Sequence, residues 1–383
     1  MDRWSPRHYE DNAVNVNPAV LASAIVIGRR IVSRNRDVQP VFTLNHLAML
    51  TEVDYGLLRN FVNRSVKPYE TFRIRKRAGP DGKKRTRLIC APTANLMKVQ
   101  RWIAKNILGK STPHEASVAF APDSKLYEAA EHHCRSRWLI KLDVANFFES
   151  IPESAAYRVF RRLGFERLIS FEMARICTRV AEGHHRPEKW KGRNNSAHPF
   201  VIAEYRQEFQ GHLPQGAPTS PMLANLACVR MDRRIAEIAA TEGLEYTRYA
   251  DDMTFSTSSK AFTRARAATF IGKVYQEMGR AGLAPNTSKT TVVNPAGRKI
   301  VLGLLVDGAA PKLTRQFKAM LRQHIYYLTR SDVGPVKHAR ARGFTSVVGL
   351  RNHVLGLLGY AGQIELTYAS EQRKAFETIV WPM

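Results

Sequence analysis

The sequence predicts an α+β fold, in which helical regions flank a central part built on short antiparallel strands. Apolar residues recur at helical spacing through most of residues 1–65 and again from Thr314 onward. Between these regions, apolar runs of strand length are joined by tight turns at 79–82 and 250–252, the pattern of antiparallel hairpins. Hydrophobic residues make up 44% of the 383 positions, which is enough for a sizeable core.

The chain is strongly basic, with 59 Lys plus Arg against 33 Asp plus Glu and a formal net charge of +26. Such a charge repels itself unless a polyanion offsets it, so nucleic acid is the leading partner and an anionic membrane surface the second. No apolar run approaches the roughly 18 residues of a membrane span. The four cysteines are too widely spaced for a disulfide framework or a zinc finger. We therefore expect a cytoplasmic, nucleic-acid-binding protein without a membrane partner.

The elements can be predicted in order along the chain. Thr43 is placed to cap a helix that begins at Leu44. A basic β-hairpin follows, and residues 73–101 carry ten Lys or Arg and a single Asp, which makes this segment the best local candidate for phosphate contacts. Helices are predicted at 94–108, 153–182, 221–240 and 264–281, buried strands at 138–144, 245–249, 253–256 and 300–306, and a polar loop or insertion at 182–212.

Three carboxylates lie at strand ends. Asp143 ends an apolar strand, and Asp251 and Asp252 are adjacent at a hairpin tip. Asp is common in turns, so the pair alone also fits an ordinary turn. Buried carboxylates need a compensating cation, however, and Mg²⁺ binds a few carboxylates together with substrate phosphates. Because strand neighbours point to opposite faces, Asp251 is the better candidate for a direct ligand and Asp252 for support.

Six short blocks between residues 70 and 306 carry a family resemblance. They lie at 87–92 with 100–101, 142–148, 213–225, 249–252, 282–290 and 301–303. The sequence YADD at 249–252 resembles the Y-x-D-D motif of reverse transcriptases, and APTSP at 217–221 resembles the bacterial retron type more than group II intron proteins. Two positions differ from the retron pattern: Glu128 replaces the Asn of an N-A-x-x-H motif that ends here at His132, and Leu302 replaces the Thr of V-T-G.

The resemblance implies a right-hand polymerase with fingers, an antiparallel-sheet palm and a helical thumb. It places a helical N-terminal region at 1–65, fingers at 66–137 and 152–212 with an insertion near 183–212, the palm at 138–151 and 213–308, and a basic thumb at 309–383. It also implies two Mg²⁺ ions, with Mn²⁺ able to substitute, bound by Asp143, Asp251, Asp252 and the backbone of Val144.

Further site residues follow from the same resemblance. Phe148 matches the aromatic gate that excludes a 2′-OH, although ordinary core packing is the alternative and only one of Phe147 and Phe148 can face the site. Lys289 matches a residue that neutralises or protonates the leaving phosphate, or is an ordinary surface lysine. The expected nucleotide contacts are Arg73, Arg87, Ala145, Phe148, Gln215, Gly216 and Lys289, and the expected nucleic-acid contacts are Arg75, Lys76, Lys83, Lys84, Arg85 and Arg101.

The implied activity is RNA-templated DNA synthesis from dNTPs. A retron arrangement further implies a cognate structured non-coding RNA as template and primer, extension from one of its 2′-OH groups to a branched RNA–DNA hybrid, and phage defence with a separate effector protein. The alternatives are a group II intron-like or other bacterial reverse transcriptase, an RNA-templated RNA polymerase, and a non-catalytic RNA-binding scaffold. Phe148 argues against the RNA polymerase, and the three carboxylates argue against the scaffold.

Overall fold

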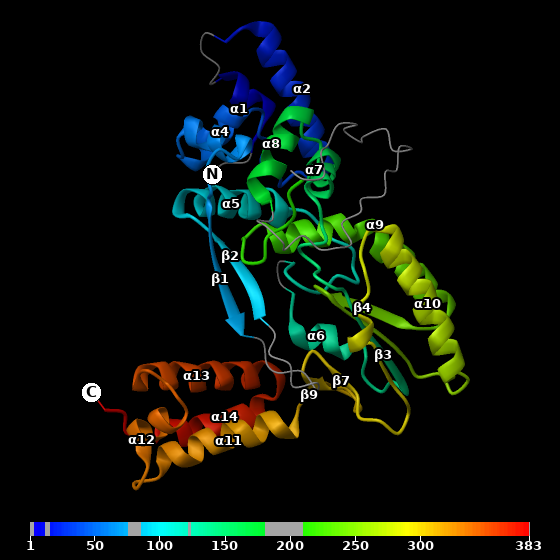
Figure 1. Ribbon diagram of the computed structural model, residues 1–383, viewed down its shortest axis with the longest axis vertical. Coiled ribbons are helices and arrows are strands. Elements are labelled where there is room, and N and C mark those ends of the chain that lie inside the picture. Colours follow the sequence, from blue (N-terminus) through cyan, green and yellow to red (C-terminus); the bar gives the residue numbers. More distant parts are fainter. Residues whose placement is uncertain (1–3, 12–15, 76–85, 122–123, 181–209, 383) are drawn as a thin grey trace.

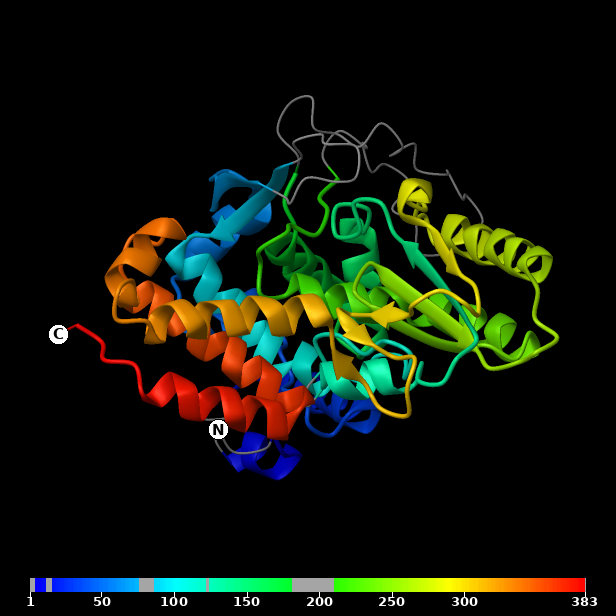
Figure 2. The ribbon, with the colours of Figure 1, turned by 90° about the horizontal axis from the view of Figure 1, so that it is seen from below.

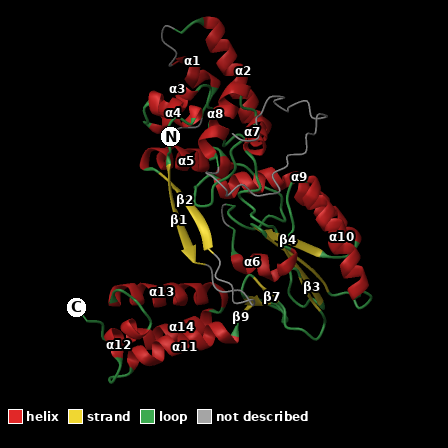
Figure 3. Cartoon of the chain, in the orientation of Figure 1, coloured by secondary structure: helices red, strands yellow, loops and turns green. Residues whose placement is uncertain are grey.

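The computed structural model describes residues 4–11, 16–75, 86–121, 124–180 and 210–382. Four predicted nucleic-acid contacts lie outside these residues, namely Lys76, Lys83, Lys84 and Arg85, and so does most of the predicted insertion. The N-terminal helices lie at one end of the long axis, the C-terminal helices at the other, and the strands between them (Figure 1). Figure 3 shows the same division by secondary structure.

The N-terminal region consists of short helices, as predicted. They are α1 (Pro6–Asp11), α2 (Pro18–Arg34), α3 (Leu44–Thr51) and α4 (Tyr55–Asn63). Thr43 caps α3 by accepting a hydrogen bond from the His46 N–H, and Asp54 caps α4 through the Leu57 N–H. Each cap satisfies a backbone donor that the first helical turn leaves free, so the capping prediction for Thr43 is confirmed.

The basic hairpin is also present. Strands β1 (Tyr69–Arg75) and β2 (Thr86–Pro92) pair antiparallel, and helix α5 (Ala94–Asn106) follows. The predicted helix over 153–182 is instead two helices, α7 (Glu153–Arg162) and α8 (Arg167–Cys177). The chain turns at Gly164, where φ is +101° and an added Cβ would lie 3.2 Å from the Ile31 Cα, so glycine permits both the turn and the close approach of α2.

The central sheet has four antiparallel strands in the order β4–β5–β3–β6. They are β3 (Trp138–Asp143), β4 (Glu245–Tyr249), β5 (Asp252–Thr257) and β6 (Thr291–Val293). Helices α9 (Ser220–Thr241) and α10 (Arg264–Arg280) pack on one face, where the Phe255 and Phe270 rings meet edge to face at 4.9 Å. Helix α6 (Leu126–Glu131) leads to the other face, where Leu139 joins a second core.

One strand prediction is wrong. The apolar run 300–306 forms a tight hairpin of β7 (Ile300–Val301) and β8 (Leu304–Leu305), which pairs with β9 (Lys312–Leu313). Leu302 and Gly303 have φ values of +50° and +84°, and these values reverse the chain between the two strands. The sequence hides this turn because apolar residues fill both arms, including the exposed Ile300, and only Gly303 marks the reversal.

The C-terminal helices share the second core, formed around side chains such as Leu321, Leu350 and Val354. They are α11 (Arg315–Thr329), α12 (Gly334–Ala341), α13 (Val347–Ile364) and α14 (Leu366–Glu377). Figure 2, seen from below, shows α11 and α14 side by side. Among the residues placed by the structure, no helix is both long and apolar enough to cross a membrane.

Gly356, Gly359 and Gly362 of α13 lie three residues apart in the sequence, a spacing that suggests close helix packing, but the structure shows such packing at only one of them. A Cβ added at Gly356 or Gly359 would meet no atom within 4 Å, so these positions face open space rather than another helix. A Cβ added at Gly362 would lie 3.8 Å from the Ala369 Cβ of α14, and one added at Gly349 would lie 3.1 Å from Ser346 Oγ. Of these contacts, only the one at Gly362 is with another helix.

Candidate active site

The three predicted carboxylates come together at one end of the central sheet. Asp143, the last residue of β3, lies directly opposite Asp252, the first residue of β5. Asp251 occupies the turn between β4 and β5, after Ala250 with a left-handed φ of +56°. The Val144 N–H donates to the Asp251 carbonyl at 3.0 Å and fastens the turn to the end of β3. The local chain geometry thus follows from one hairpin turn and one antiparallel register.

Asp143 is 4% exposed and has two side-chain partners from the segment before β6. Lys289 Nζ lies 2.5 Å from its Oδ2, and Asn286 Nδ2 donates to its Oδ1 at 2.8 Å. The Asn286 N–H also donates to the Asp143 carbonyl at 2.7 Å. A buried carboxylate requires such partners, and the half-exposed Lys289 supplies the balancing charge.

The other two carboxylates carry excess negative charge. Burial raises the pKa of Asp251 above its ordinary value, the charge of Asp143 raises it further, and Lys289 and Arg87 act in the opposite direction. Burial likewise raises the pKa of Asp252, and the adjacent Asp251 adds to the effect. Both shifts mean that the ionised form of each carboxylate is destabilised, mainly by burial and further by its acidic neighbours.

These residue types fit a magnesium ion, which takes oxygen ligands from few carboxylates. Within the described part of the chain, the structure contains no group of three His, Cys, Asp or Glu side chains that is arranged to hold a metal ion. Asp143 is instead engaged with Lys289. The carboxylate donors are therefore of the kind that Mg²⁺ prefers.

The raised pKa of Asp252 predicts an effect on the stability of the metal-free protein. The folded-state pKa of Asp252 is raised, so the folded chain holds this proton more tightly, and stability falls as pH rises from the ordinary Asp value of about 3.9 through the raised value. Asp252→Asn should therefore raise the melting temperature at pH 7 by about 1–3 °C. Melting curves in EDTA between pH 3 and 8 test this. The gain should disappear at the acid end, and a lower melting temperature at pH 7 would contradict it.

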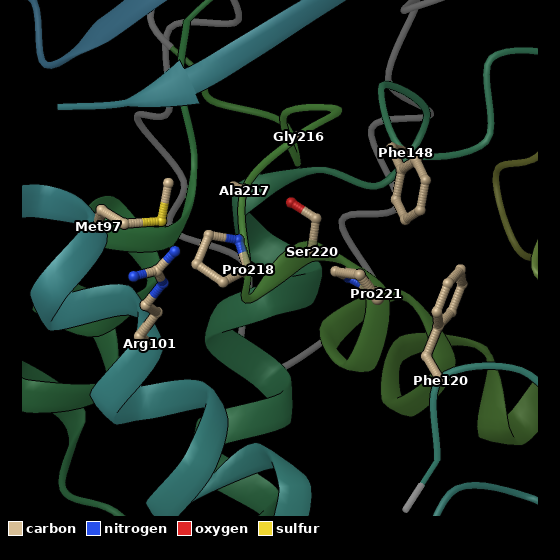
Figure 4. A pocket seen from close by; sticks show the side chains of 9 residues that line it. All are labelled: Met97, Arg101, Phe120, Phe148, Gly216, Ala217, Pro218, Ser220 and Pro221. Carbon is tan, nitrogen blue, oxygen red and sulfur yellow. The ribbon is translucent and has the colours of Figure 1, made fainter. Parts of the chain in front are cut away.

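An open pocket of about 420 Å³ lies between α5 and the start of α9. Figure 4 shows Met97 and Arg101 of α5 on one side, Phe120 and Phe148 on the other, and the loop before α9 between them. Its lining residues are Met97, Arg101, Phe120, Phe148, Gly216, Ala217, Pro218, Ser220 and Pro221. Phe147 is 4% exposed and packs in the core, so Phe148 is the one of the two adjacent rings that faces the pocket.

The loop before α9 is bonded to the basic hairpin. The Cys90 N–H of β2 donates to the Gln215 carbonyl at 2.8 Å. Gly216 has a φ of +112°, and an added Cβ would lie 3.0 Å from Ile89 Cγ2 and 3.1 Å from the Cys90 carbonyl oxygen. Sequence reasoning expected this glycine to permit close approach of a nucleotide. In the structure it is the backbone of β2, at Cys90, that approaches Gly216 closely. Gly216 also lines the pocket.

The backbone at Val144 and Ala145 is engaged within the protein. The Val144 N–H bonds to Asp251, and the Ala145 N–H donates to the Ala284 carbonyl at 2.9 Å. The Ala145 carbonyl accepts from Ser150 Oγ at 3.1 Å. Contacts from these two residues to a metal or nucleotide thus remain predictions, and their N–H groups are already committed.

The basic side chains expected at the site are exposed. Arg73, Arg75 and Arg87 project from the hairpin, and Arg73 Nη1 donates to Thr86 Oγ1 at 3.3 Å. Arg87 is close enough to the acidic turn to lower the pKa of Asp251. Arg101 lies on α5 beside the pocket. The hairpin and α5 therefore bring positive charge to the side of the pocket and carboxylates.

Sequence reasoning missed several residues of this region. Arg248 is fully buried beside the acidic turn, Asn286 bonds Asp143, and Phe120 completes the pocket wall. His133, which follows the His132 of the family motif, is buried and bonded through Nδ1 to Ser256 Oγ and through Nε2 to Thr247 Oγ1. Burial lowers the pKa of His133 to about 3, so this ring is neutral. Arg248 carried no clear signal in the sequence, because its strand Glu245–Tyr249 also contains Glu245 and Thr247.

An acidic turn joining two antiparallel strands, opposite a third carboxylate and beside a basic hairpin, is the palm of a nucleic-acid polymerase. Residues 74–328 match the family model of reverse transcriptase (RNA-dependent DNA polymerase), so the chain belongs to this family. It is an RNA-directed DNA polymerase with the right-hand fold that the sequence predicts. Reverse transcriptases generally use divalent metal ions and bind nucleic acids.

Curated relatives are retron enzymes. The chain is 28% identical over 337 residues to Retron Ec86 reverse transcriptase of Escherichia coli, covering 88% of this chain and 93% of that protein. It is 29% identical over 322 residues to Retron Mx65 reverse transcriptase of Myxococcus xanthus, covering 81% of this chain and 68% of that protein. The predicted resemblance to retron-type reverse transcriptases is confirmed.

Solved structures are more distant. A telomerase from Candida albicans in complex with a fragment of telomeric RNA aligns with a TM-score of 0.41 and 11% identity, over 83% of this chain and 59% of that one. A foamy viral protease–reverse transcriptase in complex with double-stranded DNA aligns with a TM-score of 0.40 and 14% identity, over 94% of this chain and 53% of that one.

Proposed function

We propose that this reverse transcriptase is a retron enzyme that copies a dedicated structured RNA. That RNA serves as both template and primer, synthesis starts from one of its 2′-OH groups, and the product is a branched RNA–DNA hybrid. The similarity to retron reverse transcriptases over most of the chain supports this assignment. The same similarity is the basis for a role in phage defence with a separate effector protein.

The observation that carries the catalytic part is the register that sets Asp143 against Asp252, with Asp251 in the adjoining turn. These three side chains would hold two Mg²⁺ ions, or Mn²⁺ in their place. Such ions lower the pKa of an attacking hydroxyl and neutralise a leaving pyrophosphate. The raised pKa values of Asp251 and Asp252 agree with a site that gains from added positive charge.

Other side chains have supporting roles in the proposal. Lys289, once released from Asp143, is a cation beside the site that can face the leaving phosphates. Arg87 brings a second positive charge from the hairpin. The Phe148 ring lines the pocket, where it would clash with a 2′-OH on the incoming sugar. Exposed arginines of the hairpin, Arg73 and Arg75, bind phosphates of the template strand.

The nucleic acid that co-purifies with the protein tests this proposal. The chain is expressed together with its neighbouring DNA, and bound nucleic acid is extracted and treated with RNase or DNase. A short DNA covalently joined to RNA through a 2′ linkage is expected, and an Asp251→Asn chain should yield the RNA without DNA. RNA alone from the unaltered chain, together with extension of an added primer, would instead favour another kind of bacterial reverse transcriptase.

A further inference from the structure

Arg248 is a fully buried guanidinium only three residues before Asp251. Both it and its partner Asp232 on α9 have side chains that are 0% exposed. The pairing is bidentate: Arg248 Nε donates to Asp232 Oδ1 at 2.8 Å, and Nη2 donates to Oδ2 at 2.6 Å. Tyr246 Oη also donates to Asp232 Oδ1 at 2.9 Å. The pair is therefore closed to solvent and rigidly oriented.

The remaining donors of Arg248 are used as well. Nη1 donates to the Ala250 carbonyl at 3.0 Å and to Asn225 Oδ1 at 3.2 Å, and Nη2 donates to Ser117 Oγ at 3.2 Å. A guanidinium has five N–H donors in a planar fork, so each one has an acceptor here. The bond to Ala250 matters most, because that residue has the left-handed φ of +56° and directly precedes Asp251.

The same guanidinium contacts the aromatic side of the site. Its Cζ lies 5.6 Å from the centre of the Phe147 ring, and that ring lies 5.5 Å from the ring of Phe148. Asn225 and Asp232 both belong to α9, which begins directly after the pocket loop. The Arg248 side chain thus contacts the acidic turn, the Phe147 ring that packs against Phe148, and helix α9.

We propose that the Arg248–Asp232 pair is a positioning element, which fixes the acidic turn relative to the pocket. A buried ion pair adds little net stability compared with apolar side chains of similar size, so stability alone does not account for it. A fork that bonds the carbonyl before Asp251 restrains where that carboxylate points. The proposal rests on the assignment of Asp143, Asp251 and Asp252 as the metal site.

Two variants separate positioning from mere support of the fold. Arg248→Lys keeps a charge for Asp232, but a single ammonium cannot occupy the separate positions of Nε, Nη1 and Nη2. The double change Arg248→Met with Asp232→Asn removes both charges, so that neither is left buried without a partner, and keeps an acceptor for Tyr246. Arg64→Lys is the matched control, because Arg64 pairs with the buried Glu153 in the fingers, away from the acidic turn.

Single-nucleotide incorporation and Mn²⁺ titration by electron paramagnetic resonance are then measured on each folded variant. We expect kcat to fall about 10- to 100-fold, because small displacements of catalytic groups have effects of this size. The KM for dNTP should change less than kcat, since neither Arg248 nor Asp232 itself lines the pocket, and Mn²⁺ should bind more weakly. Arg64→Lys should lower the melting temperature without changing kcat or Mn²⁺ binding.

Full kcat and unchanged Mn²⁺ affinity in a folded Arg248 variant would overturn the proposal. So would failure of both variants to fold, because the pair would then be needed for the fold itself. Asp251→Asn is measured in parallel: if it keeps both synthesis and Mn²⁺ affinity, the metal-site assignment is what has failed. If it loses both while the Arg248 variants keep them, only the positioning role is wrong.

Discussion

Asp251→Asn is expected to lower DNA synthesis by at least about 10³-fold, equivalent to about 4 kcal/mol in the activation barrier. Asn has nearly the same shape as Asp but lacks the negative charge. Asp251 lies in the turn between β4 and β5, next to Asp252, which is paired with Asp143 across the sheet. Binding of RNA should be unchanged, because the substitution leaves in place the exposed arginines of the hairpin and α5 that we propose as phosphate contacts. Single-nucleotide incorporation and RNA binding at fixed salt measure the two effects.

A matched control is available in the N-terminal region. Asp54→Asn makes the same chemical change in the cap of α4, where Asn caps about as well as Asp, so synthesis should be unaffected. Synthesis by Asp251→Asn at a tenth or more of the unaltered rate would contradict the proposed site. A parallel loss of RNA binding would mean instead that the substitution disturbs the fold.

Phe148→Ala is expected to reduce discrimination against ribonucleotides by about 10- to 100-fold. Phe148 faces the pocket while Phe147 is buried, so removing the ring opens space where a 2′-OH would otherwise clash. The quantity to measure is the ratio of kcat/KM for dATP to that for ATP on one primer and template. The ratio should fall mainly through faster use of ATP.

Phe120→Ala provides the comparison, because this second ring also lines the pocket but comes from a different segment. It should affect the two nucleotides alike and leave their ratio unchanged. An unchanged ratio in Phe148→Ala with a reduced ratio in Phe120→Ala would move the gate to Phe120. A reduced ratio in both variants would mean that the pocket selects by overall width.

Elements with strong local signals were predictable from sequence. The alternation of the hairpin, the cap at Thr43 and the apolar strands that end in Asp143 and Asp251-Asp252 all depend on neighbours in the chain, and the structure has them. The resemblance to reverse transcriptases supplied the order of these elements.

Features that depend on distant contacts were not predictable. Arg248 looks like one polar residue in a strand, and its five acceptors come from α9, the turn and the segment at Ser117. The hairpin at 300–306 is hidden because apolar residues fill both of its short arms and only Gly303 marks the turn. The open face at Gly356 depends on which helices surround α13, and a spacing of small residues does not reveal that.

The contact between Gly216 and β2 bears on how the enzyme can move. The Cys90–Gln215 hydrogen bond and the absence of a side chain at Gly216 bring strand β2 and the loop before α9 to van der Waals distance. A rotation of the hairpin would therefore carry this wall of the pocket with it. A bulkier residue at position 216 would force the two parts away from each other, since its Cβ alone would lie 3.0 Å from Ile89 Cγ2.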